Sequence, residues 1–573
     1  MIWWLNDPAR ARAERRALAE LAETVPWLGT VCWQVGASGV LTVNLDIEHE
    51  GTAFPLTMAY SAFHPDAPPT LTPRDGRRLS GHQYGAGGSL CLEYRADNWE
   101  TGITGAMMVE SAYRLIAGER GPEEGEVPSA HRVSVGQRVR GQALRLLLTE
   151  VADDRLRAIA VGVPVELGIA ERWQSGTLVA TVTDIEGVDG LGAWPAGVPA
   201  TMKRGFAVRI PAGSPIPPST TDALLAMLDA AGLTDVRERM LAPGEVDLVV
   251  LHDGEPVLFT AFDGKDGRLF ARCATVVTRD AGVRVPPEYA SLAGARVGIV
   301  GCGSLGSKVA AMLVRAGVRR LTLVDDDLML AGNVVRHELG ATAVGVHKVA
   351  ALKDRLVEIA GELDVIARAV ALGGQESAEV TGAAMASLEE CDVIVDATAD
   401  PRCFNLCAAA ARAGRRPMAW AEVFAGGLGG IVARVRPGHE PDPQVARNRI
   451  DAWCCGHGVP APRPGPAPYS APGGGGTPLV ADDADVSVIA AHLARFVTDL
   501  LVRPGHSAFP SPAYAIGLKQ GWIFSAPFET WPVDFGAAPP WEVPRDGAPA
   551  EEALELLREL MPTIFDDNNQ PSA

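Results

Sequence analysis

The sequence has no long hydrophobic run, and we expect no export signal. None of its uninterrupted apolar stretches approaches the roughly 18 residues that a membrane-spanning helix needs. The first 24 residues place their charges after the apolar residues and lack a small-residue cleavage site, which indicates an amphipathic helix and not a signal peptide. We therefore expect a cytoplasmic protein with no membrane partner.

Positive charge and paired cysteines are also scarce. Lysine and arginine number 51 against 70 aspartates and glutamates, and the net charge of −19 argues against a nucleic-acid partner. The nine cysteines are odd in number and irregularly spaced, so we expect no disulfide framework. No two of them form a C-x-x-C pair, so we expect no structural zinc.

The chain is too long for one hydrophobic core, and its 573 residues suggest three or four domains. A charged segment rich in Gly and Pro at 118–131 indicates a linker, and a second Pro/Gly-rich stretch at 459–477 indicates a loop. The polar end at 566–573 is typical of disorder. The expected parts are an α+β domain at 1–125, a middle α+β domain at 132–285 without a chemical motif, an α/β domain at 286–540 and a tail at 541–573.

Strands and helices alternate from residue 295 onward, which predicts a doubly wound parallel sheet with helices on both faces. Its first strand is followed directly by G-x-G-x-x-G, formed by Gly301, Gly303 and Gly306. Such glycines allow a tight turn and let backbone N–H groups approach an anionic ligand. Asp325 ends the next strand, where an acid can bind ribose hydroxyls. These features alone fit a nicotinamide-dependent oxidoreductase at least as well as an ATP-using enzyme.

The residues after Asp325 resemble ThiF/MoeB proteins and ubiquitin-activating enzymes, in which the ribose acid precedes an Asn, an Arg and a Lys. The resemblance implies an enzyme that uses ATP and Mg²⁺ to adenylylate a protein C-terminus and that forms a homodimer. Cationic donors suit this chemistry because charge develops on the α-phosphate as pyrophosphate leaves, whereas a dehydrogenase has no need of them. The matching positions are Asp325, Asp327, Asn333, Arg336 and Lys348.

The resemblance also implies a magnesium-binding acid after the following buried strand. The family usually reads D-x-T-D there, and this chain reads DATAD, so the acid is either Asp400 or Asp396; we expect Asp400. The alternative role for Asp400 is a helix N-cap before Pro401. His337 replaces the Gln that is common after the Arg, which we interpret as a minor change.

The N-terminal domain resembles ubiquitin-conjugating enzymes, through a Pro-rich turn, a His, a G-S-x-C-L sequence around Cys91 and a Trp eight residues later. A thiol suits acyl transfer because the thiolate is nucleophilic and its thioester stays reactive toward amines. The alternative is that Cys91 is a small buried hydrophobe. The family's His-Pro-Asn becomes His-Gln-Tyr here, so the Asn is absent, and we expect His82 to be a core histidine.

A conjugating-type and an activating-type domain in one chain resemble the fused proteins of bacterial antiviral operons. That resemblance implies thioester relay to a target amine, and Cys454 or Cys455 is the expected activating-domain thiol, unless the pair is adventitious. The activated partner would be a nucleotidyltransferase or a ubiquitin-like protein. Two alternatives remain: a plain adenylyltransferase with a non-catalytic N-terminal domain, and a nicotinamide-dependent oxidoreductase.

Overall fold

The computed structural model describes most of the chain, which divides into two compact units, residues 1–142 and 143–573. The predicted linker after residue 118, the predicted loop at 459–477 (apart from 470–471) and the predicted disordered end lie outside the described residues. The described residues are 2–36, 38–79, 81–84, 87–118, 134–191, 199–214, 220–242, 246–252, 254–265, 267–278, 284–458, 470–471, 479–536, 539, 541 and 550–561.

The first unit contains a four-stranded antiparallel sheet in the order β1-β2-β3-β4. Alternate residues of β2 from Leu41 to Ile47 are buried, as the two-residue period of a strand requires when one face covers a core. Asp7 begins the long helix α2 by accepting from the Arg10 N–H, and Pro8 occupies the first turn. The elements are α1 (Trp3–Asn6), α2 (Pro8–Thr24), β1 (Leu28–Val35), β2 (Leu41–His49), β3 (Thr52–Tyr60), β4 (Thr70–Pro73), α3 (Gly105–Gly118) and α4 (Val135–Arg138).

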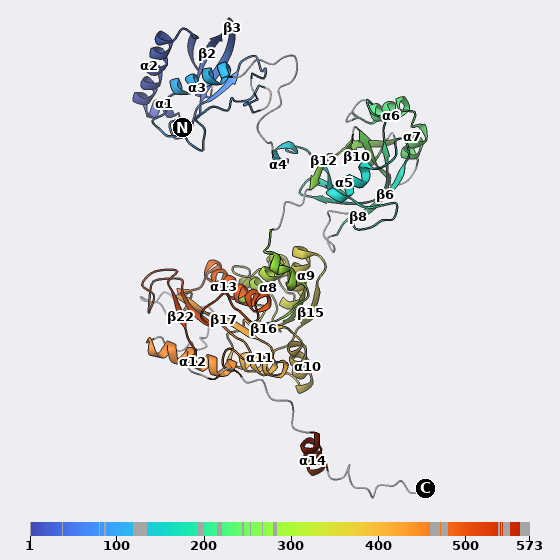
Figure 1. The fold of residues 1–573 in the computed structure, drawn as a ribbon, viewed down its shortest axis with the longest axis vertical. Coiled ribbons are helices and arrows are strands. Elements are labelled where there is room, and N and C mark those ends of the chain that lie inside the picture. The colour runs from blue at the N-terminus through green and yellow to red at the C-terminus, as the bar shows by residue number, and fades with distance from the viewer. Residues whose placement is uncertain are drawn as a thin grey trace. The chain divides into compact units, whose positions relative to one another are not determined.

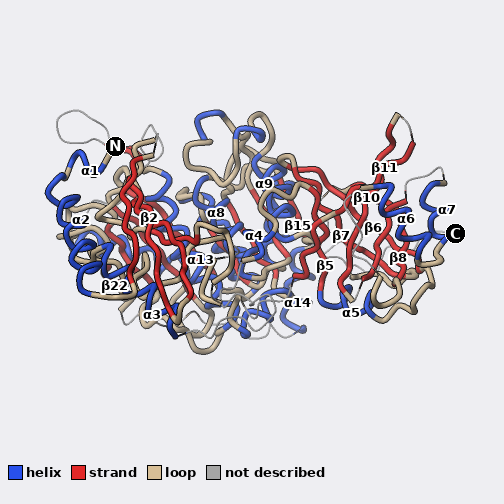
Figure 2. The backbone as a smooth tube through the Cα atoms, turned by 90° about the horizontal axis from the view of Figure 1, so that it is seen from above, coloured by secondary structure: helices blue, strands red, loops and turns tan. Residues whose placement is uncertain are grey.

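The second unit begins with an eight-stranded mixed sheet in the order β11-β10-β9-β8-β6-β7-β5-β12. Its strands are red in Figure 2, where β5, β6, β7 and β8 are labelled. The elements are β5 (Leu144–Thr149), α5 (Glu150–Arg157), β6 (Val165–Gln174), β7 (Thr177–Ile185), β8 (Thr201–Arg209), α6 (Thr221–Ala230), α7 (Thr234–Leu241), β9 (Val246–His252), β10 (Glu255–Gly264), β11 (Gly267–Arg272) and β12 (Ala274–Thr278).

A second eight-stranded sheet follows, in the order β15-β14-β13-β16-β17-β18-β21-β22. Its first five strands are parallel, which confirms the predicted Rossmann-like fold, and the last three extend it antiparallel. The elements up to the fifth strand are η1 (Pro287–Ala293), β13 (Arg296–Val300), α8 (Ser304–Ala316), β14 (Arg320–Val324), η2 (Ala331–Asn333), η3 (Ala341–Ala343), α9 (Lys348–Ala360), β15 (Asp364–Arg368), α10 (Ala378–Glu389), β16 (Val393–Asp396), α11 (Pro401–Gly414) and β17 (Met418–Phe424).

The antiparallel part of this sheet begins at a tight turn in which Gly426 and Gly427 both have positive φ, a conformation that favours glycine. This turn reverses the chain, where a helical crossover would have continued the parallel order. The remaining elements are β18 (Gly429–Val435), α12 (Pro443–Gly456), β19 (Ser470–Ala471), β20 (Leu479–Val480), α13 (Asp483–Val502), β21 (Ala513–Gly517), β22 (Thr530–Val533) and α14 (Ala550–Leu560).

Both faces of the sheet are covered by helices, as Figure 1 shows. Val297 and Ile299 of β13 lie in a core with residues of α8, α9 and α13, whereas Val300 lies in a second core with residues of α10, α11 and α12. Strand residues on opposite faces therefore contribute to different cores, as in a doubly wound domain. Within the described parts of the chain, no helix combines the length and apolar character that crossing a membrane requires.

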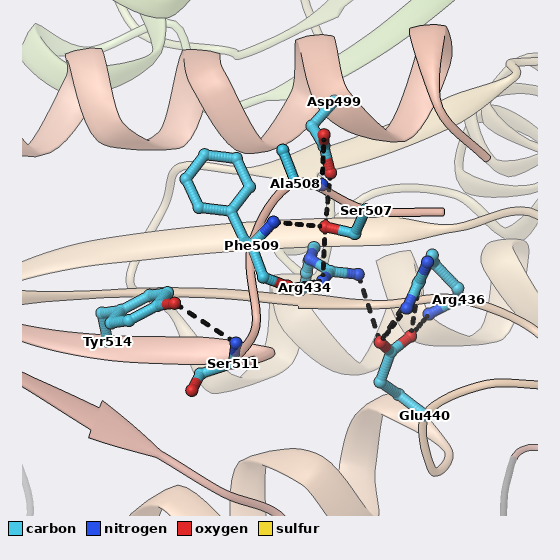
Figure 3. A network of polar contacts seen from close by, with 9 residues as sticks. All are labelled: Arg434, Arg436, Glu440, Asp499, Ser507, Ala508, Phe509, Ser511 and Tyr514. Atoms are coloured by element: carbon cyan, nitrogen blue, oxygen red, sulfur yellow. Dashed lines mark hydrogen bonds and ion pairs between the residues drawn. The ribbon is translucent and has the colours of Figure 1, made fainter. Parts of the chain in front are cut away.

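A buried charged network connects β18 to α13 and to the turn that precedes α12 (Figure 3). The fully buried Arg434 donates to Glu440 Oε1 (3.1 Å) and to Ser507 Oγ (2.8 Å). Arg436 forms an ion pair with the same carboxylate, at 2.7 Å. Ser507 in turn donates to Asp499 Oδ2 of α13 (2.5 Å). Because each carboxylate has several donors, the network holds three elements in fixed positions.

Candidate functional site

The glycine turn has the form that a phosphate-binding turn requires. Gly301 has φ +86, and a Cβ on Gly306 would lie 1.8 Å from the carbonyl oxygen of Gly301, so both positions require glycine. A Cβ on Gly303 would meet nothing within 4 Å, which leaves open space in front of the backbone at the start of α8. The three glycines therefore provide a tight turn, an open approach and close packing, in that order.

Asp325 lies beside this turn. Its Oδ2 accepts a hydrogen bond from the N–H of Cys302 (2.7 Å), inside the glycine motif, and its Oδ1 accepts from the N–H of Asp327 (2.8 Å). Burial raises the pKa of the Asp325 carboxyl above its ordinary value, although the nearby Lys348 charge opposes this shift. The structure thus brings the predicted ribose acid and the predicted phosphate turn together.

Lys348 is the first residue of α9 and is almost fully buried. Its Nζ lies 2.6 Å from Asp327 Oδ2, whose side chain is two-thirds exposed. A buried ammonium with one exposed carboxylate partner can exchange that partner for a phosphate oxygen at modest electrostatic cost. Asp327 and Lys348, both predicted for the site, are therefore partners of each other in this structure.

Arg336 and Asn333 lie in the segment between β14 and α9. Arg336 Nη1 donates to the carbonyl oxygen of Ala481 (3.1 Å), just before α13. The Asn333 side chain accepts from the N–H of Leu330 (2.9 Å) and so caps the short helix η2. Asn333 thereby shapes the segment that carries Arg336. This structural function of Asn333 is additional to the ligand contact that the sequence predicts for it.

His337, which we interpreted as a minor replacement, forms two buried hydrogen bonds with the backbone. Its Nδ1 accepts from the N–H of Leu339 (3.1 Å), so Nε2 carries the proton and donates to the carbonyl oxygen of Cys302 (2.8 Å). Burial lowers the pKa of this imidazole and keeps it neutral. His337 therefore fixes the glycine turn through the carbonyl oxygen of Cys302. Its position after Arg336 in the sequence does not reveal this role.

The two candidate metal acids have different surroundings. Asp400 is the N-cap of α11, accepting from the N–H of Arg402 (2.7 Å), and forms an ion pair with the Arg402 side chain (2.7 Å). These interactions lower its pKa. Asp396 is buried at the end of β16 and accepts from the N–H (2.9 Å) and Oγ1 (2.6 Å) of Thr398, while burial raises its pKa to about 6. The described residues contain no cluster of three or more His, Cys, Asp or Glu side chains suited to a metal ion.

Cys454 and Cys455 are neighbours near the end of α12 with opposite environments. Cys454 is buried, and burial, reinforced by the charge of Asp451, raises its pKa to about 11. Cys455 is exposed. Because the thiolate is the nucleophile, the exposed thiol is the better candidate of the two.

Cys91 is half-buried in the loop between β4 and α3. The phenol of Tyr84 donates to its Sγ (3.8 Å), and the pKa of Arg95 is raised chiefly by interaction with the same thiol. Cys91 is therefore partly exposed and has polar neighbours, which disagrees with the alternative of a small buried hydrophobe.

The prediction that His82 is a core histidine is wrong, because the side chain is exposed. Its neighbour Gln83 is buried instead, and the Gln83 side chain accepts from the N–H of Leu79 (2.8 Å) and donates to the carbonyl oxygen of Gly88 (3.1 Å). Gln83 forms an isolated bridge with Leu90 next to a turn, and its buried amide is satisfied there because its oxygen accepts from one backbone group and its nitrogen donates to others.

Comparison with known proteins supports the assignment of the second sheet. Residues 279–456 match the model of the ThiF family. An uncharacterized protein, y4qC of Sinorhizobium fredii, is 27% identical over 60% of this chain and 64% of its own length. The ATP-dependent ubiquitin transferase-like protein Cap2 of Enterobacter hormaechei is 42% identical over 18% of this chain and 17% of its own. The chain spans less than two thirds of the length of the curated relatives that it matches.

Among solved structures, the chain is similar to E. coli MccB with ATP. The sequence identity is 17% and the TM-score 0.33, and the match covers 44% of this chain and 67% of that chain.

Proposed function

We propose that the domain at 286–540 adenylylates the C-terminal carboxylate of a partner protein, with ATP and Mg²⁺. The observation that carries this proposal is that the open glycine turn, Asp325 and Lys348 lie together at the carboxyl ends of β13 and β14. Ligands of open α/β sheets bind at this edge. The match to the ThiF family and the similarity to a protein named ATP-dependent ubiquitin transferase-like support it.

The reaction assigns a task to each residue of the site. A carboxylate oxygen of the partner attacks the α-phosphorus of ATP, the bond to the bridging oxygen of the β-phosphate breaks, and pyrophosphate leaves with that electron pair. Lys348 and Arg336 stabilise the charge that develops on the phosphates, and Asp325 binds the ribose. An oxidoreductase transferring hydride has no such charge to stabilise, so these cations favour the adenylylating function.

A magnesium ion bound with ATP would reduce the negative charge of the phosphates. Proteins usually hold this ion through one or two carboxylates together with phosphate oxygens and water. Asp400, the acid that the sequence predicts, is the more exposed of the two candidates but is bound to Arg402 and to the start of α11. Asp396 is buried and accepts two hydrogen bonds from Thr398, so both acids remain candidates for this role. The absence of a larger acidic cluster among the described residues agrees with a metal that arrives with its nucleotide.

The same proposal includes an acyl relay. The thiolate of Cys455 attacks the carbonyl carbon of the acyl adenylate and AMP leaves; the acyl group then passes to Cys91 and finally to a target amine. The exposure of Cys455 and the polar neighbours of Cys91 support this order. By resemblance, the partner is a nucleotidyltransferase or a ubiquitin-like protein, the chain is a homodimer, and the setting is bacterial antiviral defence.

ATP–pyrophosphate exchange with proteins encoded beside this chain's gene tests the adenylylation step. Exchange is expected with one of them and should disappear when its last residues are removed. Binding and reduction of NAD⁺ without any exchange would contradict the proposal.

The relay has its own test. ATP and the partner should give an adduct on Cys91 that thiol reductants cleave. Cys455→Ala should block this adduct, whereas the matched variant Cys454→Ala should not, and Cys91→Ala should leave exchange intact. Normal target modification by the Cys91→Ala protein would contradict the relay.

A further inference from the structure

A second buried cation, besides Lys348, lies close to the glycine turn. Lys308 belongs to α8, two residues after Gly306, and is only 7% exposed. Its Nζ lies 2.8 Å from Asp483 Oδ1, in the first turn of α13, and the Asp483 side chain is about half exposed. Lys308 is outside the Asn-Arg-Lys series of the ThiF resemblance, and no sequence motif singles it out.

Lys308 and Arg336 are both bound by one short stretch of chain. Arg336 donates to the carbonyl oxygen of Ala481, and Lys308 forms its ion pair with Asp483, two residues further on. The oxygens of this stretch therefore satisfy two cations from different elements, α8 and the segment after β14.

The charge of Lys308 also reaches the centre of the site. The pKa of His337 is lowered first by burial, and the positive charges of Lys348 and Lys308 lower it further. His337 donates to the carbonyl oxygen of Cys302 inside the glycine motif. The positive charges of Lys308 and Lys348 thus both act on the imidazole that fixes the turn.

We propose that Lys308 is a phosphate-binding residue for the β- and γ-phosphates of ATP, and that Asp483 holds it in place when no nucleotide is bound. The inference rests on the proposed function and extends it to a residue beyond the family series. A buried ammonium that pairs with a single exposed carboxylate can exchange it for the oxygens of a more highly charged phosphate group. On binding, the phosphates replace Asp483 as the partner of Lys308.

A second account of the same ion pair is that it only joins α8 to α13. The two accounts predict different effects of Asp483→Asn on ATP affinity. If the pair is structural, Lys308→Met and Asp483→Asn have similar effects. If Lys308 binds phosphate, Lys308→Met weakens ATP binding, whereas Asp483→Asn, which removes a competing carboxylate, leaves it unchanged or strengthens it. Lys519 offers a matched control, because its Nζ pairs with Asp485 of the same helix turn at 3.0 Å.

Calorimetric titration of the full chain with Mg·ATP and with AMP tests the inference. Lys308→Met should weaken ATP binding about tenfold or more, the scale of a lost charge-assisted hydrogen bond, and should leave AMP binding unchanged. Lys308→Arg should retain most of the ATP affinity, and Lys519→Met all of it. Thermal unfolding confirms that each variant is folded.

Three results would overturn the inference. They are unchanged ATP affinity in Lys308→Met, equal loss of ATP and AMP binding in that variant, or equal weakening of ATP binding by Lys308→Met and Asp483→Asn. The failure of the proposed function is distinguishable, because in that case the unmodified chain itself would not bind Mg·ATP.

Discussion

Adjacent residues of a helix point about 100° apart, so Cys454 and Cys455 of α12 meet different surroundings. We expect iodoacetamide at pH 8 to alkylate Cys455 readily and Cys454 hardly at all, because Cys454 is buried and its pKa is raised to about 11. Peptide mapping by mass spectrometry measures both sites in the same sample. Equal labelling of the two thiols would contradict this assignment.

Asp396 should make stability depend on pH. Burial raises its pKa from 3.8 to about 6, so the folded chain binds the proton more tightly than the unfolded chain does. The stabilisation of the folded state by the protonated Asp396 carboxyl is fully present below about pH 4. It is lost as the pH rises through about 6, and the free energy of unfolding then falls by at most about 3 kcal/mol. The melting temperature of Asp396→Asn should therefore exceed that of the unmodified chain by an amount that grows between pH 5 and pH 7.5. A constant difference would show that Asp396 does not titrate in this range.

At the scale of elements, the glycine turn allows a matched pair of substitutions. Gly306→Ala should destabilise the fold by several kcal/mol, because its Cβ would lie 1.8 Å from the Gly301 carbonyl oxygen. Gly303→Ala should fold normally, since its Cβ meets no protein atom within 4 Å. It should weaken Mg·ATP binding, because the added methyl group fills the space in which the phosphates approach the backbone. Thermal unfolding and calorimetry separate the two effects. Equal effects of the two variants on stability would refute this division of roles.

The buried network of Arg434, Arg436 and Glu440 makes a second prediction at this scale. Glu440→Ala leaves two arginines without their carboxylate, one of them fully buried, and should cost about 3–5 kcal/mol of stability. Glu358→Ala removes an exposed ion pair with Arg355 in the same domain and should cost less than about 1 kcal/mol. Urea unfolding measures both. A loss below about 1 kcal/mol for Glu440→Ala would show that the network does not fix the turn before α12 to the sheet.

For the whole molecule, the parts that were predictable from sequence are those with local signals. The alternation of strands and helices predicted the parallel sheet, and the spacing from Gly301 to Asp325 predicted a turn and an acid that the structure places within one hydrogen bond of each other. Both features depend on residues that are close in sequence, so their geometry follows from regular secondary structure.

Contacts between distant segments could not be predicted in this way. Lys308 meets Asp483 across 175 positions, and no local pattern encodes that pairing. The buried cluster of the middle sheet is similar: Lys203 lies 2.9 Å from Glu171 and 3.7 Å from Asp247, on three strands that the sequence does not mark as neighbours. The reversal from β17 to β18 occurs at a turn containing Gly426 and Gly427, which the sequence pattern left undetected.

The most direct test of the central claim is a calorimetric comparison of Mg·ATP and NAD⁺ binding by three forms of the full chain. We expect the unmodified chain to bind Mg·ATP and not NAD⁺. Lys348→Ala should weaken ATP binding at least about tenfold, through loss of a charge-assisted contact. Lys353→Ala, an exposed lysine of the same helix, should leave binding unchanged. Binding of NAD⁺ in preference to Mg·ATP, or equal ATP affinity in all three forms, would contradict the account.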